Sequence, residues 1–246
     1  MRKVGDMASN RTLARIAGLL YLVVGVGGGF GEYVRSSVRV AGDAAATAAN
    51  VAGHVSLLRI GFVTDLVDFV CFLGVGLVLY RLLRSVDPGV AVAMLVINAV
   101  SVGIQALNML NQVAALLVAT QPGYTAGMSH EATQGLVLLL MDMQHQGYVI
   151  AQIFFGLYLL PLGYLVYRSH MFPRALGVLL AIGCGGYIAG VAADYLSPTF
   201  DSTLAVYFGI LGGLAELAFL LWLLVFGTRK QTQGRHAASE MKGELA

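Results

Sequence analysis

The chain has 246 residues, of which 58% are hydrophobic and only 11% charged, and its mean hydropathy is +0.78. This composition excludes an ordinary soluble globular domain. The net charge of +2 is too small, and the basic residues too dispersed, for a nucleic-acid partner. We therefore predict an all-α, multi-pass membrane protein whose main partner is the lipid bilayer.

Six apolar runs are long enough to cross the hydrocarbon core of a bilayer, which takes about 20 helical residues. They cover residues 13–34, 57–84, 88–120, 147–168, 173–195 and 203–226. We predict that they form one bundle of six transmembrane helices, within a membrane domain that spans residues 12–227. The flanking segments, 1–11 and 228–246, are predicted to be tails, the second of them disordered.

The basic residues predict the orientation. Twelve of the fifteen Lys and Arg residues fall at one set of helix ends, and the other set keeps Arg35, Arg39 and Arg59. Cytoplasmic loops carry the excess of basic residues, so we expect both termini in the cytoplasm and the protein in a bacterial cytoplasmic membrane. The first run lacks a small-residue cleavage site and is predicted to stay as a helix.

The first span is rich in glycine in its outer half. Gly25 and Gly29 have the four-residue spacing that lets two membrane helices approach closely. A nucleotide-binding glycine loop does not fit, because no strand precedes it and the glycine register is wrong. Glu32 and Arg35, three residues apart at the outer end, predict a local interfacial ion pair.

The segment before the second span predicts a short helix on the outer surface. Asp43 is suited to cap a helix and precedes an alanine-rich run that ends near His54. If this helix continued into the second span without a bend, His54, Asp65 and Asp68 would share one face.

Two carboxylates lie inside the second span. Asp65 and Asp68 are three residues apart, so they lie on one face of the helix. An ionisable group at membrane depth is costly and marks either a functional site or a packing hydrogen bond. We find no Lys or Arg in the apolar runs placed to offset them, and Arg59 points to the opposite side. We therefore expect the pair to share a proton that a cationic ligand would displace.

The third span carries a seam of polar residues at heptad spacing. Its members recur on one face of an otherwise apolar helix, namely Asn98, Ser101, Gln105, Asn108 and Gln112. The seam must face the bundle. It is either a set of interhelical hydrogen bonds or one wall of a polar cavity.

The segment from residue 129 to 168 predicts two helices. Ser129 is a suitable cap for a short outer-surface helix that ends near Asp142, and the fourth span follows from residue 147. Asp142, His145 and Gln152 recur at heptad-like intervals and predict a polar face at the entrance of this span. Pro161 is expected to kink it.

The last two spans add close-packing glycines and one deep acid. Gly186 and Gly190 repeat the four-residue spacing in the fifth span, and Glu216 lies near the middle of the sixth. Cys71 and Cys184 fall inside apolar runs, where they behave as small hydrophobes and indicate no disulfide.

Eight polar residues fall at similar depth, roughly 10 to 20 Å from the outer ends at about 1.5 Å per residue, or at the mouth above that layer. They are Asp65, Asp68, Asn108, Gln112, Asp142, His145, Gln152 and Glu216. The inner halves of the spans are nearly pure hydrocarbon. We therefore predict an outward-facing cavity that binds a small molecule or a cation, rather than a continuous pore.

The motifs of common membrane enzymes are missing, so no catalytic residue, cofactor or metal is predicted. The dispersed histidines cannot hold a haem between two helices. A metal site formed by Asp65, Asp68, Asp142 and His145 is a minor alternative. Three alternative functions stay open: a proton-coupled small-solute carrier, an outer-leaflet intramembrane enzyme, and a non-catalytic sensor or partner subunit.

Three stretches carry a resemblance to a known family. They are VAGDAAATAANV with the LLR that follows it, LYRLLRSVDP, and above all HQGYVIAQIFFGLYLLPLGYLVYRSHMFPRALGVLL. From about Arg11 onward the chain resembles the bacterial membrane-protein family known as domain of unknown function 4386. The resemblance implies a single six-helix module and no particular activity. His170 departs from it, since glycine is expected at that turn.

Overall fold

The computed structural model describes residues 2–196 and 202–229, and all regular structure in these ranges is helical. Six long helices are each apolar enough to cross a membrane: α1 (Arg2–Val38), α3 (Val55–Leu83), α4 (Pro88–Thr120), α5 (His130–Arg168), α6 (Arg174–Leu196) and α7 (Ser202–Val225). A short helix, α2 (Ala44–Gly53), and a single 3-10 turn, Pro122–Tyr124, lie in the connections. The prediction of an all-α protein with six spans is confirmed, and the chain is a multi-pass membrane protein.

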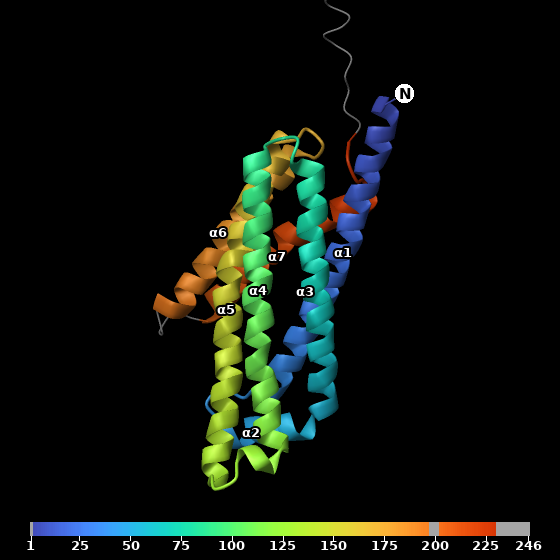
Figure 1. Cartoon of the computed structure of the whole chain (residues 1–246). Coiled ribbons are helices and arrows are strands. Elements are labelled where there is room, and N and C mark those ends of the chain that lie inside the picture. The colour runs from blue at the N-terminus through green and yellow to red at the C-terminus, as the bar shows by residue number, and fades with distance from the viewer. Residues whose placement is uncertain (1, 197–201, 230–246) are drawn as a thin grey trace, which may run out of the picture.

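The six long helices form a closed ring. Each of them packs on the next along the chain, from α1 on α3 through to α6 on α7, and α7 packs back on α1. The short helix α2 packs mainly on α5 and α4, at the end of the bundle opposite the N-terminus (Figure 1). The middle of the ring is therefore enclosed by side chains from all six spans.

The outside of the ring is apolar. Large hydrophobic side chains stand exposed along the spans, with Val70 73% and Leu107 70% accessible, as expected for surfaces that face lipid. The polar side chains of the seam on α4 point the other way, because Asn98, Ser101 and Asn108 are buried. Apolar side chains outside and polar side chains inside are the reverse of the arrangement in a soluble protein, and they agree with a membrane environment.

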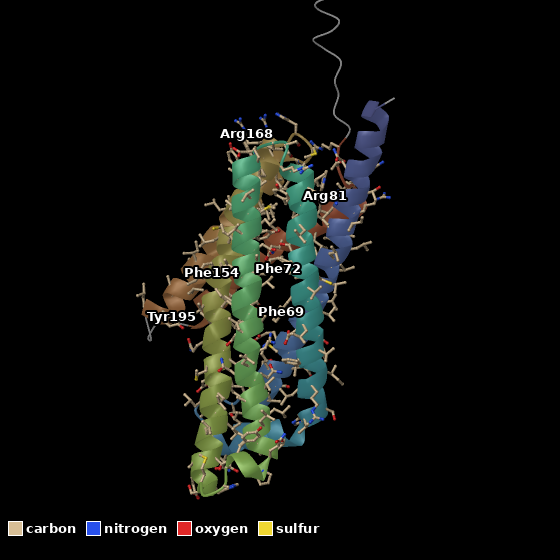
Figure 2. The ribbon with its side chains drawn as sticks, in the orientation of Figure 1. Phe69, Phe72, Arg81, Phe154, Arg168 and Tyr195 are labelled. Atoms are coloured by element: carbon tan, nitrogen blue, oxygen red, sulfur yellow. The ribbon has the colours of Figure 1, made fainter. Side chains whose placement is uncertain are left out.

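Both ends of the described chain lie at the same end of the bundle (Figure 1). Arg81 and Arg168 are at this end too, as Figure 2 shows. These two basic residues therefore lie at the same end of the bundle as the termini, as the sequence predicts. That this end is cytoplasmic stays a prediction.

The connection before α3 agrees with the sequence analysis. Asp43 caps α2 by accepting a hydrogen bond from the amide of Ala46, at 2.9 Å. The helix ends at Gly53, and His54 caps it with non-helical backbone angles before α3 begins. The chain therefore bends here, and His54 is exposed rather than part of the carboxylate-bearing face.

The prediction of a separate short helix before the fourth span is wrong. Ser129 does cap a helix, by accepting a hydrogen bond from the amide of Ala132, but that helix is α5 itself, which runs unbroken for 39 residues. Nothing in the segment forces a break, because its only proline, Pro161, comes much later and lies inside the continuous helix. α5 also packs along α4, which holds it straight through the junction.

The two predicted tails differ in outcome. α1 begins at Arg2, so the segment predicted as an N-terminal tail continues the first helix. The predicted tail at the other end lies outside the described residues from position 230 onward.

At the turn between α5 and α6, His170 has φ +54°, in the left-handed region that glycine favours. This conformation is the physical reason why glycine is expected there.

Buried apolar residues form two clusters at different heights. The large apolar cluster fills the half of the ring nearer the termini, with Phe72, Leu79, Tyr158, Leu162 and Phe219 at its centre. The small apolar cluster lies beneath α2 and consists of Val34, Val38, Val51, Leu58, Ala115, Val137 and Met141. The layer between them holds most of the buried polar side chains.

Candidate functional site

A cavity of about 370 Å³ lies in the polar layer between the two apolar clusters. All six long helices contribute to its wall. Its charged and polar lining side chains are Tyr21, Arg35, Asp65, Asp68, Gln105, Asn108, Gln144, Tyr148, Gln152, Tyr187 and Glu216. Phe69, labelled in Figure 2 at mid-height of the bundle, is one of its apolar lining residues.

Five of the eight residues singled out in the sequence come together in this cavity. They are Asp65, Asp68, Asn108, Gln152 and Glu216. Their common depth along separate helices is what placed them in one layer. The other three, Gln112, Asp142 and His145, are not among the lining residues.

Arg35 is a lining residue whose main partner the sequence does not predict. Its predicted ion pair with Glu32 forms, at 3.4 Å. The Arg35 side chain is nevertheless only 9% exposed, and its Nη1 donates to Asp65 Oδ2 at 2.6 Å. The expectation that no basic side chain offsets the aspartate pair is therefore wrong. α1 continues to Val38, which places Arg35 against α3.

Arg35 also connects α1 to α5. Its guanidinium lies over the ring of Tyr148, 5.6 Å from the centroid. Just beyond the end of α1, Arg39 donates to Asp142 Oδ1 at 2.7 Å. These contacts tie the two helices together on the α2 side of the cavity.

Asp68 has no such partner. It is 7% exposed, and its Oδ1 has no hydrogen-bond partner among the described residues. The space for its carboxylate comes from α1, because a Cβ added at Gly27 would meet Asp68 Oδ1 at 3.3 Å. A buried carboxylate oxygen without a donor is costly, so this atom marks the point where a ligand or a proton is most needed.

The glycines of α1 divide into two groups. Gly27 and Gly31 face the aspartates of α3, and a side chain at Gly31 would collide with the carboxylate of Asp65. Gly25 and Gly29 have nothing within 4 Å of an added Cβ, and both line the cavity. The predicted close helix contact at Gly25 and Gly29 is thus wrong, because these two glycines leave space open instead.

Glu216 is the second anionic centre of the cavity. The hydroxyl of Tyr21 donates to its Oε1, and the hydroxyl of Tyr187 donates to its Oε2 at 2.8 Å. Glu216 is 8% exposed, so the two tyrosines replace the water that an exposed carboxylate would have. A buried tyrosine hydroxyl needs a partner, but the chain has 11 tyrosines and the sequence cannot say which of them face Glu216.

The seam on α4 serves both of its predicted roles. Asn98 donates to the carbonyl of Phe72 at 3.3 Å, and Asn108 donates to the carbonyl of Gln144 at 2.7 Å. These are interhelical hydrogen bonds of the expected kind. Asn108 also lines the cavity, together with Gln105. Gln112 is buried outside it and donates to the carbonyl of Leu58 at 3.3 Å.

The helical geometry of α5 explains why Asp142 and His145 lie elsewhere. The residues of α5 that line the cavity are Gln144, Tyr148, Ala151, Gln152 and Phe155. At about 100° per residue, Asp142 falls on a different face, where Arg39 meets it. His145 falls at the edge of the lining stripe, about 20° from Gln152, and is not among the lining residues.

The described residues hold no group of three His, Cys, Asp or Glu side chains that could bind a metal ion. The minor alternative of a metal site also needs Asp142 beside the two aspartates of α3, whereas Asp142 is paired with Arg39. The cavity instead combines carboxylates with tyrosine, phenylalanine and amide side chains.

One of the comparisons with known proteins identifies a family, and none of them identifies an activity. The family described as "Domain of unknown function (DUF4386)" matches residues 16–227. A protein of Archaeoglobus fulgidus, described as "Uncharacterized protein", is 32% identical over 80 residues, which are 32% of this chain and 46% of that protein. The match therefore spans about half the length of this relative. No solved structure matches the chain.

Proposed function

The chain belongs to the family described as domain of unknown function DUF4386, and we propose that the cavity within its ring of six helices binds a small cationic solute. The observation that carries this proposal is Asp68, a buried residue that lines the cavity and whose Oδ1 atom lacks a hydrogen-bond partner among the described residues. A donor with positive charge is the ligand chemistry that this atom lacks.

The charge balance of the cavity supports a cation. Three carboxylates line it, those of Asp65, Asp68 and Glu216, and the only basic lining side chain is Arg35. Arg35 is already paired with Asp65 at 2.6 Å. A carboxylate without a positive partner at membrane depth raises the free energy of the folded protein. The binding of a cation would remove this free-energy penalty.

The aromatic lining supports an organic cation. Phe69, Tyr148 and Phe155 line the same cavity as Asp68, and the ring of Tyr148 already holds one cation, the guanidinium of Arg35. The faces of aromatic rings attract ammonium groups, and this attraction grows when water is excluded. The small volume, about 370 Å³, is at the lower end for small-molecule sites and excludes large ligands.

The test is a series of melting curves of the purified protein in detergent, at constant ionic strength, with sodium, potassium, methylammonium or n-butylamine. We expect at least one amine to raise the melting temperature of the parent. Asp68→Asn should abolish this rise, because the amide no longer offers the ligand a negative charge.

Asp142→Asn is the matched control, since it makes the same chemical change at a carboxylate outside the cavity. Its response to amines should equal that of the parent. A rise that survives in Asp68→Asn, or the lack of any cation response in the parent, contradicts the proposal.

A carrier is the second candidate function, and the position of the cavity favours it. The cavity lies within the ring of six helices, between the centres of the large and the small apolar cluster. Carriers place their substrate sites near the middle of the membrane and open them to one side at a time. Uptake of a bound amine into vesicles that contain the protein, lost in Asp68→Asn, would support transport beyond binding.

A further inference from the structure

We propose that the solute is a linear aliphatic diamine, with one ammonium group at Asp68 and the other at Glu216. This inference rests on the proposed function and names the class of ligand for the same cavity. It starts from the number of negative charges that the cavity leaves without a basic partner.

Two carboxylates remain once the pair of Arg35 and Asp65 is set aside. Among residues 2–196 and 202–229, the Oδ1 of Asp68 has no hydrogen-bond partner, and Glu216 accepts hydrogen bonds from the hydroxyls of Tyr21 and Tyr187. Tyrosine hydroxyls solvate a carboxylate but do not cancel its charge. A ligand with a single charge would therefore leave one buried carboxylate uncompensated, whereas a diamine matches both.

The two carboxylates also occupy separate places in the wall. Asp68 is on α3 and Glu216 is on α7, and these helices flank α1 from its two sides in the ring. The part of α1 that lines the cavity includes Gly25, Gly28 and Gly29, which leave its backbone without side chains. A slender ligand can therefore extend past α1 from one carboxylate to the other.

The remaining wall suits a methylene chain. The apolar side chains that line the same cavity are Val24, Phe69, Met109, Phe155, Leu217 and Leu220. Ligand sites of this kind combine an apolar wall with a few polar groups that fix orientation. Here the polar groups are two carboxylates, so the complementary ligand is apolar in its middle and cationic at both of its ends.

The experiment compares diamines with monoamines of equal length, by titration calorimetry on the full chain in detergent. The probes are putrescine and n-butylamine, and cadaverine and n-pentylamine. We expect the better diamine to bind the parent about tenfold or more tightly than its monoamine, because it makes a second charge pair in a dry site. Asp68→Asn should lower the affinity for both the diamines and the monoamines.

Glu216→Gln is the decisive variant. It should reduce the affinity for the diamine much more than that for the monoamine, so that the ratio of the two affinities falls to near one. Tyr187→Phe removes one hydroxyl that positions Glu216 while keeping its charge, so it should retain the preference for the diamine. Asp142→Asn again serves as the control with an intact cavity.

The possible failures are distinguishable. If n-butylamine and putrescine bind the parent equally, or if the diamine keeps its advantage in Glu216→Gln, the diamine assignment is overturned while cation binding stands. If neither kind of amine binds, the proposed function falls as well. If Glu216→Gln does not fold, the ratio of the two affinities in the parent decides, because a single-charge site gives a ratio near one.

Discussion

The two halves of the ring are stabilised by different means. In the half nearer the termini, the large apolar cluster packs without charge: Phe72 stacks on Phe155 at 4.8 Å, and the ring of Phe172 meets that of Phe219 edge-on at 5.6 Å. In the cavity half, a buried ion pair of Arg35 and Asp65, at 2.6 Å, connects α1 to α3.

The difference between the halves shows which part of this membrane protein is packed for stability and which part keeps a destabilising buried polar group. Lipid is as apolar as leucine, so the apolar half gains stability from close packing rather than from the removal of water. At Gly163, an added Cβ would meet the carbonyl oxygen of Gly177 at 2.7 Å, which shows how closely α5 and α6 approach there. The cavity half gives up such packing and keeps an unpartnered carboxylate oxygen on Asp68. Structure that is not optimised for stability is the expected signature of a binding site.

The largest expected effect concerns which side of the membrane each half faces. A reporter enzyme that works only outside the cytoplasm should be active when fused after Gly127, at the α2 end, and silent when fused after Arg84, at the end with the termini. The reason is the excess of basic residues at the latter end. The reverse pattern of activity would place the cavity half toward the cytoplasm.

The next effect tests the ion pair of the cavity half. Asp65→Asn should lower the free energy of unfolding by about 3 kcal/mol, because Arg35 would remain buried without its main partner. Unfolding of the detergent-solubilised protein by a denaturing detergent measures this. The double variant with Arg35→Gln should recover part of the loss. Asp142→Asn is the control, at under about 1 kcal/mol, since its pair with Arg39 is partly exposed.

A pair of neighbouring leucines tests the apolar half. Leu223 is fully buried in the large apolar cluster, whereas Leu221 is 49% exposed on the same helix. Leu223→Ala should cost about 2 kcal/mol through the void it leaves, and Leu221→Ala less than about 1 kcal/mol, because lipid fills the space. Amine binding should be unchanged in both. Equal losses would mean that packing does not distinguish the core from the lipid-facing surface.

Gly31 and Gly29 of α1 test how closely this helix packs on its neighbours in the cavity half. Gly31→Ala should cost about 1 to 2 kcal/mol, because its Cβ would displace the carboxylate of Asp65 from Arg35. Gly29→Ala should be neutral or slightly stabilising, since nothing lies within 4 Å of the added Cβ. Both variants can be compared by the same unfolding measurement. A loss in Gly29→Ala as large as in Gly31→Ala would show that α1 packs differently there.

The smallest effect is expected at the turn between α5 and α6. His170→Gly should stabilise the protein by about 1 kcal/mol, because φ +54° is strained for histidine and free of strain for glycine. A shift of the melting temperature by a few degrees would reveal it. His170→Ala, which keeps a Cβ in the same conformation, should give no such gain.

The sequence determined those properties that depend on one helix at a time. Length and hydropathy predicted six spans, and the caps at Asp43 and Ser129 were correctly read from residue type alone. Depth along each span also brought five of the eight candidate residues to one cavity. Each of these inferences needs only the rise and the periodicity of a helix.

Only the tertiary structure decided which faces meet. Arg35 turns toward Asp65, Tyr21 and Tyr187 reach Glu216, and Gly29 borders open space instead of a helix. Periodicity states which residues share a face of one helix, but the rotation and tilt of each helix are set by packing against its neighbours. For this reason the sequence located the polar layer, while the tertiary structure decided which carboxylate oxygen, Oδ1 of Asp68, is left without a hydrogen-bond partner among the described residues.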